Sequence, residues 1–229
     1  GGRTLDVLIQ IADGARTMTE VGKQLGRAGV TDALQRLLEQ DLVQRNGTCW
    51  MVTDPVLRCW LSTILKAQRL EAQPDGSVVR SRFEQFLRVR WTQWVQTEQL
   101  SFSEQVVTLF KQFCDDTVSL DAKIGRLPRF HSIATQGSAG PAEEVYVVAD
   151  GQDRRWCASV QRGSVDEDAI ARFDAFCRAQ APRPSRKVLI AQARLDDHAR
   201  LLAKAANMWV WGSSDLKMLQ GLYDPAPVS

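Results

Sequence analysis

Apolar residues recur every three or four positions through the first 53 residues, the spacing that lines one side of an α-helix. They predict helices over residues 5–12, 17–25 and 30–40. Two short apolar runs then flank Asn46-Gly47. Asn-Gly between such runs favours a tight hairpin, because both turn positions require positive φ. Three helices followed by a hairpin predict a winged helix-turn-helix over residues 1–53.

Residues 54–123 have the pattern of a helical connector. Asp54 can cap a helix and Pro55 suits a first helical turn, so we expect a helix over 56–72. Further helices are expected over 77–100 and 103–113, with the first two separated by a turn rich in polar residues and glycine.

The helix expected over 77–100 mixes arginines with aromatic residues. Its members are Arg80, Arg82, Arg88 and Arg90, interleaved with Phe83, Phe86, Trp91 and Trp94. At helical spacing we favour a core position for the aromatic rings and a solvated position for the arginines. The alternative is that the rings stack on nucleic-acid bases while the arginines contact phosphates.

Residues 124–229 alternate short apolar runs with amphipathic stretches, which predicts an α/β domain with a mixed sheet and parallel neighbours. The expected strands cover 130–135, 143–149, 155–161, 186–191 and 208–211, and the expected helices cover 166–180, 196–206 and 213–222. Trp209 and Trp211 fall on the last strand and face the same side. Core packing is favoured for both, with a pocket or partner surface as the alternative.

Charge sets a limit on nucleic-acid binding. The net charge is +2, and basic and acidic residues nearly balance in all three segments. Proteins that grip DNA usually carry a basic excess, because neutralising phosphates supplies much of the affinity. DNA binding here would require charges sorted onto one face. No apolar run approaches the ~18–20 residues of a membrane span, so no membrane partner is expected.

The five cysteines are scattered, without a CxxC pair, and the chain has only two histidines. This argues against a zinc site and predicts reduced, mostly buried thiols in a cytoplasmic protein. We expect no metal and no cofactor. The chain begins with Gly1-Gly2 and not with methionine, so we expect a fragment of a longer protein.

One short motif carries a family resemblance. After the expected hairpin the chain reads Asp54-Pro-Val-Leu-Arg-Cys-Trp60. This resembles the Asp-Pro-x-x-Arg-Phe-Trp stretch in the C-terminal region of archaeal-type AAA+ ATPases, with Cys59 in place of the aromatic residue. The resemblance implies a winged helix, a helical linker and a C-terminal restriction-endonuclease-like domain of the PD-(D/E)XK type. It also places the ATPase module upstream of Gly1, since no GxxxxGK[ST] loop occurs in this chain.

The resemblance also implies where a nuclease metal site would lie. In the family, an acid on the second strand and an acid-x-lysine on the third hold a divalent cation and steady the attacking water. Glu144, or its neighbour Glu143, matches the first acid, whereas the third strand offers Ser159-Val160-Gln161. With the second acid and the lysine both replaced, we expect Glu144, Ser159 and Gln161 to form a degenerate site without catalysis.

Four residues of the first segment are candidates for DNA contacts. Gln35 and Arg36 lie on the outward face of the third helix, and Lys23 and Arg45 could reach the phosphate backbone. Asp32 and Glu39 on the same helix would face phosphates badly.

We therefore expect a non-catalytic DNA-binding or DNA-sensing region of a larger ATPase. One alternative is a module that docks another protein subunit without contacting nucleic acid. A less favoured alternative is a nuclease with a displaced metal site that uses Glu84, Glu143 or Glu144.

Overall fold

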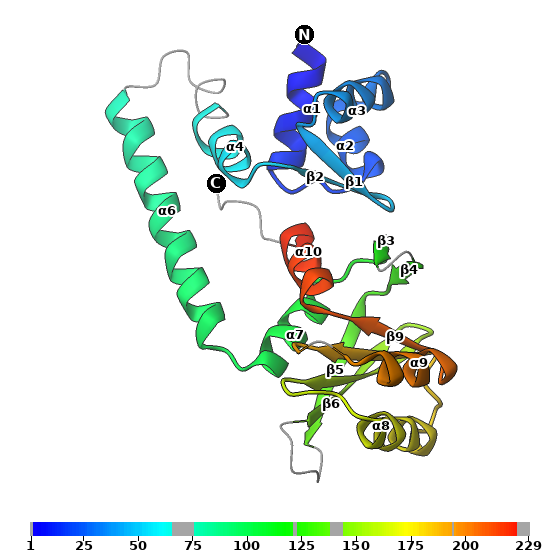
Figure 1. Ribbon diagram of the computed structural model, residues 1–229. Coiled ribbons are helices and arrows are strands. Elements are labelled where there is room, and N and C mark those ends of the chain that lie inside the picture. The colour runs from blue at the N-terminus through cyan, green and yellow to red at the C-terminus, as the bar shows by residue number, and fades with distance from the viewer. Residues whose placement is uncertain (1, 66–75, 121–122, 138–143, 194, 224–229) are drawn as a thin grey trace. The chain divides into compact units, whose positions relative to one another are not determined.

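The computed structural model describes residues 2–65, 76–120, 123–137, 144–193 and 195–223, except the side chains of Val79 and Arg82 (Figure 1). The chain has mixed α and β structure and divides into two compact units. The first comprises Gly1–Gln99 with Thr117–Ser119, and the second comprises Leu100–Asp116 with Leu120–Tyr223. The division into three domains at residues 53 and 123 stays a prediction.

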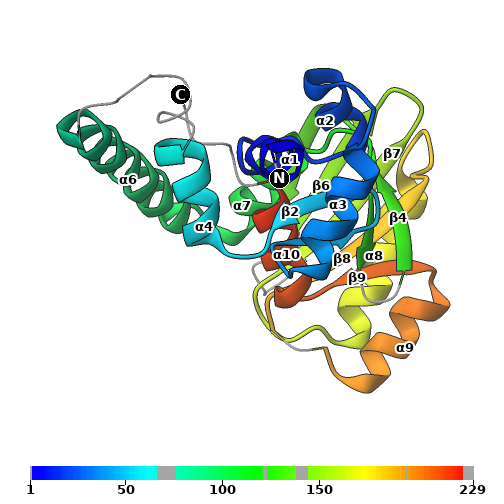
Figure 2. The same cartoon turned by 90° about the horizontal axis from the view of Figure 1, so that it is seen from above.

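The first unit begins with three helices and a hairpin, as the apolar spacing predicts. The elements are α1 (Gly2–Ala12), α2 (Met18–Leu25), α3 (Val30–Glu39), β1 (Val43–Asn46) and β2 (Cys49–Val52). Val7, Leu34 and Leu37 are among the fully buried side chains that join the helices to the hairpin. Figure 2 shows α1, α2 and α3 gathered beside β2. Each helix buries one apolar stripe, and this burial stabilises the unit.

The tight turn of the hairpin lies one residue later than Asn46-Gly47. Asn46 pairs with Cys49, so the two loop residues are Gly47 and Thr48. Gly47 has φ of 60°, whereas Asn46 is not among the residues with positive φ in the described chain. Positive φ at the first loop position alone is the pattern of a type II′ turn. Asn46 instead exchanges hydrogen bonds with the backbone of Ser119, at 3.0 Å to its carbonyl oxygen and 2.6 Å from its amide nitrogen.

Helices follow the hairpin in the first unit. They are α4 (Pro55–Trp60), the π-helical turn η1 (Leu61–Leu65) and α6 (Gly76–Gln99). The Asp54 carboxylate accepts hydrogen bonds from the amides of Val56 at 2.7 Å and Leu57 at 3.3 Å, which confirms the predicted cap. The prediction of a helix over 56–72 is confirmed as far as Leu65, and its remainder lies outside the described residues. The long helix over 77–100 is also confirmed.

The second unit opens with α7 (Phe102–Lys111), which confirms the helix expected over 103–113. A pair of short strands follows that the sequence analysis missed, β3 (Asp116–Leu120) and β4 (Lys123–Leu127), although the middle of β3 groups with the first unit. The sequence held a signal for β3, since the apolar Val118 and Leu120 alternate with the polar Thr117 and Ser119.

A five-stranded mixed sheet forms the centre of the second unit. Its order is β5 (Phe130–Gly137), β6 (Glu144–Gly151), β7 (Arg155–Gln161), β8 (Arg186–Ala191) and β9 (Met208–Trp211). The first three strands pair antiparallel and the last three pair parallel, which confirms the predicted mixed sheet. Helices α8 (Glu167–Ala179) and α9 (Asp197–Ala205) connect the parallel strands, and α10 (Ser213–Tyr223) follows β9.

The two faces of the sheet have different cores. Alternate residues of β6, β7 and β8, such as Tyr146, Cys157 and Leu189, pack against α8 and α9 (Figure 1). The opposite face carries Trp156, Trp209 and Trp211, all at most 3% exposed, whose rings form a cluster with Phe110 of α7. The core position favoured for Trp209 and Trp211 is therefore confirmed. Within the described chain, no helix has both the length and the apolar character needed to cross a bilayer.

An ion pair joins α8 to the sheet and gives a pH-dependent prediction. Lys187 Nζ of β8 donates to Asp174 Oδ1 of α8 at 2.6 Å, and this bond holds the pKa of Asp174 below its usual value. A carboxyl with a lowered pKa stabilises the fold above its unfolded pKa, and the contribution is lost as pH falls through the folded value. We expect Lys187→Met to cost about 1–2 kcal/mol of unfolding free energy at pH 7.

The deficit of Lys187→Met should shrink as the pH falls from about 4, the pKa of an unfolded aspartate, toward the lower pKa of Asp174 in the folded protein. Urea unfolding of both proteins from pH 7 downward measures it. The matched control is Arg178→Met, because Arg178 also pairs with Asp174 but its side chain is 78% exposed. That variant should change stability by less than about 0.5 kcal/mol. A deficit that stays constant with pH would contradict the assignment to the ion pair.

Candidate functional site

The structure brings together the three residues that the family resemblance marks as a degenerate metal site. On the antiparallel strands β6 and β7, Glu144 pairs with Gln161, and Tyr146 pairs with Ser159. Because side chains alternate along a strand, Glu144, Ser159 and Gln161 all lie on the face that packs against α8. They are 3%, 0% and 5% exposed.

Hydrogen bonds link the three side chains into one cluster. Ser159 Oγ donates to Glu144 Oε1 at 3.2 Å, and Gln161 Nε2 donates to the same oxygen at 2.9 Å. Gln161 Nε2 also lies 3.0 Å from Ser159 Oγ. Two neutral donors thus bond to one carboxylate oxygen. The alcohol and the amide act as hydrogen-bond donors to Glu144, and they do not replace the second acid of a metal site.

The positive charge beside Glu144 comes from α8. Nε and Nη2 of Arg172 each lie 3.4 Å from Glu144 Oε2. The Glu144 side chain is 1% exposed, whereas that of Arg172 is 41% exposed. On α8 the flanking positions Ile170 and Phe173 are buried, so Arg172 lies at the edge of the apolar stripe and reaches over it. The sequence analysis missed Arg172, which stands 28 positions from its partner.

This cluster does not fit a divalent cation. Magnesium and related ions bind several oxygen ligands, usually more than one of them anionic, and the cluster offers a single carboxylate. A guanidinium already faces that carboxylate, and a metal there would meet a like charge. Within the described part of the chain, no group of three or more histidine, cysteine, aspartate or glutamate side chains is placed to hold a metal ion. The arrangement suits a buried ion pair with satisfied hydrogen bonds.

Glu84, one of the other acids considered for a displaced site, has a partner outside this cluster. Glu84 belongs to α6 in the first unit, where its side chain is 51% exposed and pairs with Arg80 at 3.0 Å. Glu143 lies outside the described residues.

The four residues predicted to contact DNA all lie exposed in the first unit, Lys23 on α2, Gln35 and Arg36 on α3, and Arg45 on β1. Two of them already have partners. Gln35 Nε2 donates to Glu39 Oε1 at 3.0 Å, so its amide is turned along the helix. Arg45 Nε donates to the carbonyl oxygen of Gly47 at 2.9 Å, and its guanidinium lies 5.6 Å from the centre of the Trp50 ring.

The tryptophans of α6 are not in a core, which corrects the interpretation favoured from the sequence. Trp91 is 65% exposed and Trp94 is 55% exposed, and their ring centres lie 5.2 Å apart at an angle of 38°. Leu87 stands one turn earlier on the same side and is 47% exposed. Phe83 and Phe86 are half-buried. Helix α6 therefore presents an exposed pair of indoles, with Arg88 exposed beside it, and not a buried aromatic stripe.

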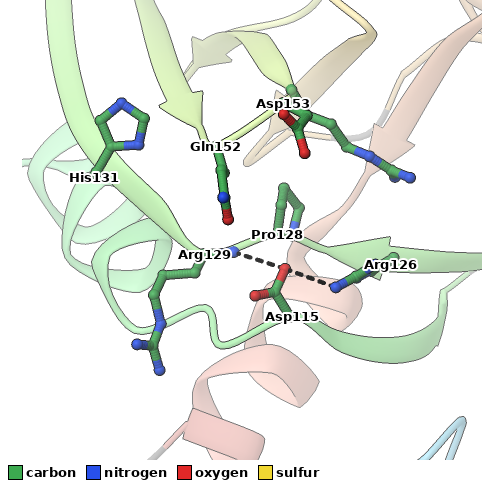
Figure 3. A pocket seen from close by; sticks show the side chains of 8 residues that line it. Asp115, Arg126, Pro128, Arg129, His131, Gln152 and Asp153 are labelled. Carbon is green, nitrogen blue, oxygen red and sulfur yellow. Dashed lines mark hydrogen bonds and ion pairs between the residues drawn. The ribbon is translucent and has the colours of Figure 1, made fainter.

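A polar cavity of about 620 Å³ lies in the second unit at the ends of β4, β5 and β6 (Figure 3). Asp115 holds its centre, accepting from the Arg129 amide and pairing with Arg126 Nη2, each at 3.3 Å. Figure 3 shows the Arg129 side chain pointing away from Asp115. The lining residues are Asp115, Arg126, Pro128, Arg129, His131, Gln152, Asp153 and Arg154. The cavity lining mixes acidic and basic side chains, and their charges do not converge on one point. The sequence analysis did not predict this cavity because it missed β3 and β4.

No family model matches the chain, and no curated protein matches its sequence. Solved structures similar to it include protein VC1899 from Vibrio cholerae, at 11% identity and a TM-score of 0.31, covering 96% of this chain and 49% of that one. Another is Can2 from Sulfobacillus thermosulfidooxidans in complex with cyclic tetra-adenylate, at 12% identity and a TM-score of 0.28, covering 99% of this chain and 57% of that one. The chain thus spans about half the length of these structures. TM-scores this low do not establish a shared fold.

Proposed function

We propose that this chain is a non-catalytic DNA-binding region of a larger ATPase, with a winged helix-turn-helix in the first unit and a degenerate PD-(D/E)XK-like domain in the second. The order of three helices and a hairpin supports the first assignment. The mixed sheet, with α8 between β7 and β8, supports the second. The Asp54-Pro55 start of α4, with Arg58 and Trp60 following, supports the ATPase origin.

The observation that carries DNA binding is the exposed tryptophan pair of α6. Proteins that bind single strands combine aromatic side chains, on which bases stack, with cations that follow the phosphates. Trp91 and Trp94 offer two ring faces to solvent, and Arg88 stands beside them on the helix. Leaving two indoles exposed costs the hydrophobic stabilisation that burial would give, which is a reason to expect a partner.

The absence of catalysis rests on the cluster around Glu144. Hydrolysis by the related mechanism needs a metal ion and a lysine beside the attacked phosphate. Here the single carboxylate is occupied by Ser159, Gln161 and Arg172. A cation that entered would have to displace a guanidinium and two hydrogen bonds.

Binding of fluorescent single-stranded and duplex oligonucleotides at low and high salt tests the proposal. We expect affinity to fall as salt rises, because phosphate neutralisation releases counterions. Arg36→Ala and Arg45→Ala should each weaken binding and lower the salt slope by about 1 if the residue contacts a phosphate. Arg200→Ala, an exposed arginine of α9 in the second unit, is the matched control and should change neither. No binding to either oligonucleotide at low salt overturns the proposal.

A protein-docking module is the second candidate, favoured by the same helix. Leu87, Trp91 and Trp94 would also suit an apolar protein surface, and the Gln35–Glu39 bond removes a base-reading amide. Binding of this kind would depend weakly on salt and would need Leu87 as much as the tryptophans.

A further inference from the structure

Three cationic side chains line a second cavity, where α8 ends and β8 begins. The cavity has a volume of about 400 Å³ and is lined by Cys177, Arg178, Arg183, Pro184 and Lys187. No acidic side chain is among the described residues that line it, in contrast to the polar cavity beside Asp115. The whole chain carries a net charge of only +2, so this lining is a local concentration of positive charge.

One carboxylate positions two of the three cations. Asp174 of α8 accepts from Lys187 Nζ at 2.6 Å through Oδ1 and pairs with Arg178 Nη2 at 2.5 Å through Oδ2. Lys187 is half-buried at the start of β8, whereas Arg178 is exposed in the last turn of α8. The ammonium group is therefore fixed against the sheet, and the guanidinium has room to turn toward an anion in the cavity.

The third cation, Arg183, is exposed on the loop between α8 and β8. Arg155 of β7 holds this loop on both sides of Arg183. Nη1 of Arg155 donates to the carbonyl oxygen of Ala181 at 2.8 Å, and the carbonyl oxygen of Arg155 accepts from the amide of Ser185 at 2.7 Å. Asp150 in turn fixes the Arg155 guanidinium with contacts of 2.5 Å and 3.1 Å. The backbone that carries Arg183 is thus in place before any ligand binds.

The charges around the cavity leave a positive excess. Arg178, Arg183 and Lys187 supply three positive charges, against one negative charge from Asp174. The C-terminal end of α8 adds about half a negative charge. Within the described part of the chain, no carboxylate pairs with Arg183. An excess of about one to two positive charges remains, which favours an anion in the cavity and opposes a cation.

We propose that Arg178, Arg183 and Lys187 form a binding site for a phosphate group. Guanidinium groups offer paired N–H donors that match the oxygens of phosphate, and the lysine adds a point charge. The volume of about 400 Å³ exceeds that of one phosphate, so the site admits a phosphate that belongs to a larger molecule. The same chemistry can come from free phosphate or from the backbone of a nucleic acid. The site does not rest on the DNA contacts proposed above, which lie in the first unit.

Titration of the ¹⁵N-labelled full chain with inorganic phosphate, followed by NMR at pH 7, tests the site. Sodium chloride keeps the ionic strength constant, so that general screening does not change during the titration. We expect saturable shifts of the amide signals of Arg178, Arg183 and Lys187. Arg183→Ala should weaken phosphate affinity about 10-fold, because hydrogen bonds to a charged group are lost. Arg183 is the residue to replace, since its loss leaves the ion pairs of Asp174 intact.

Two further variants show whether the effect belongs to this cavity. Arg183→Lys keeps the charge but not the paired donors, and should recover part of the affinity that alanine loses. Arg200→Ala removes an exposed arginine of α9 in the same unit and should leave the affinity unchanged within about twofold.

A second titration, with a single-stranded oligonucleotide, identifies the source of the phosphate. Shifts at the three residues with inorganic phosphate alone assign a small phosphate compound, and shifts with both ligands assign a general phosphate site. Shifts with the oligonucleotide alone that Arg183→Ala abolishes assign the nucleic-acid backbone. If phosphate binds here and the oligonucleotide binds nowhere on the chain, the DNA-binding proposal fails and the phosphate site stands.

Two results would overturn the proposal. The first is that neither ligand shifts the signals of Arg178, Arg183 and Lys187. The second is a set of shifts that spreads over exposed cations, Arg200 included, and stays the same in Arg183→Ala. Such a pattern is that of non-specific attraction between an anion and surface charges, and it would leave the cavity without a role in binding.

Discussion

Replacing Arg172 with methionine should lower the free energy of unfolding by about 2–3 kcal/mol at pH 7. Removing one partner of a buried ion pair typically costs about 3–5 kcal/mol, because the other charge is left without compensation. The Glu144 side chain is 1% exposed and would lose this guanidinium while keeping the hydroxyl and amide donors of β7. The half-exposed Arg172 and its 3.4 Å contacts place the expected cost below that range. Urea unfolding followed by circular dichroism measures it.

Glu144→Gln separates the charge from the shape of the cluster. The amide keeps an oxygen for Ser159 and Gln161, and Arg172, at 41% exposed, can turn its guanidinium to water. We expect a cost of about 1 kcal/mol for this variant. The double variant with Arg172→Met should be more stable than the sum of the two single losses predicts, because no buried charge remains. Arg200→Met on α9 is the exposed control and should stay within about 0.5 kcal/mol of the parent.

Strict additivity of the two losses would show that Arg172 acts by packing and not by charge. A metal site formed by the same residues would predict a different result, namely stabilisation of the protein by a divalent cation. If magnesium or manganese raised the melting temperature of the parent and not that of Glu144→Gln, a cation would be binding beside Ser159. The assignment of this cluster as a closed ion pair would then be wrong.

Local patterns predicted the elements of the second unit well. The strand expected over 186–191 and the one over 208–211 have the same bounds in the structure, because each is a run of apolar residues between polar or helix-breaking segments. The strands predicted from the sequence also place Glu144, Ser159 and Gln161 on consecutive strands, and these strands pair in the structure.

Partners that are distant in the sequence could not be predicted in the same way. Arg172 is one of several polar residues on an amphipathic helix, and nothing in its spacing tells that it reaches Glu144. Helical spacing likewise groups the aromatic residues of α6 without showing whether a neighbour covers them. For Trp91 and Trp94 the spacing favoured a core position, whereas both side chains are exposed.

The exposed rings of α6 give the second large prediction, on affinity and not on stability. Trp91→Ala and Trp94→Ala should each weaken binding of a single-stranded oligonucleotide about 5- to 150-fold, because stacking contributes about 1–3 kcal/mol per base. Unfolding free energies should stay within about 0.5 kcal/mol of the parent, since the rings are 65% and 55% exposed. Fluorescence anisotropy at one fixed salt concentration measures the affinities.

The matched control lies on the same side of the helix. Leu87 is 47% exposed and apolar but has no ring, so Leu87→Ala should leave oligonucleotide affinity unchanged within about twofold. Trp91→Phe keeps a ring and should retain part of the affinity that alanine loses. Equal losses from Leu87→Ala and Trp91→Ala would mean that contact depends on apolar area and not on stacking. Such a result favours a protein partner for this helix, because a leucine side chain packs in an apolar interface but offers no π-face to a base.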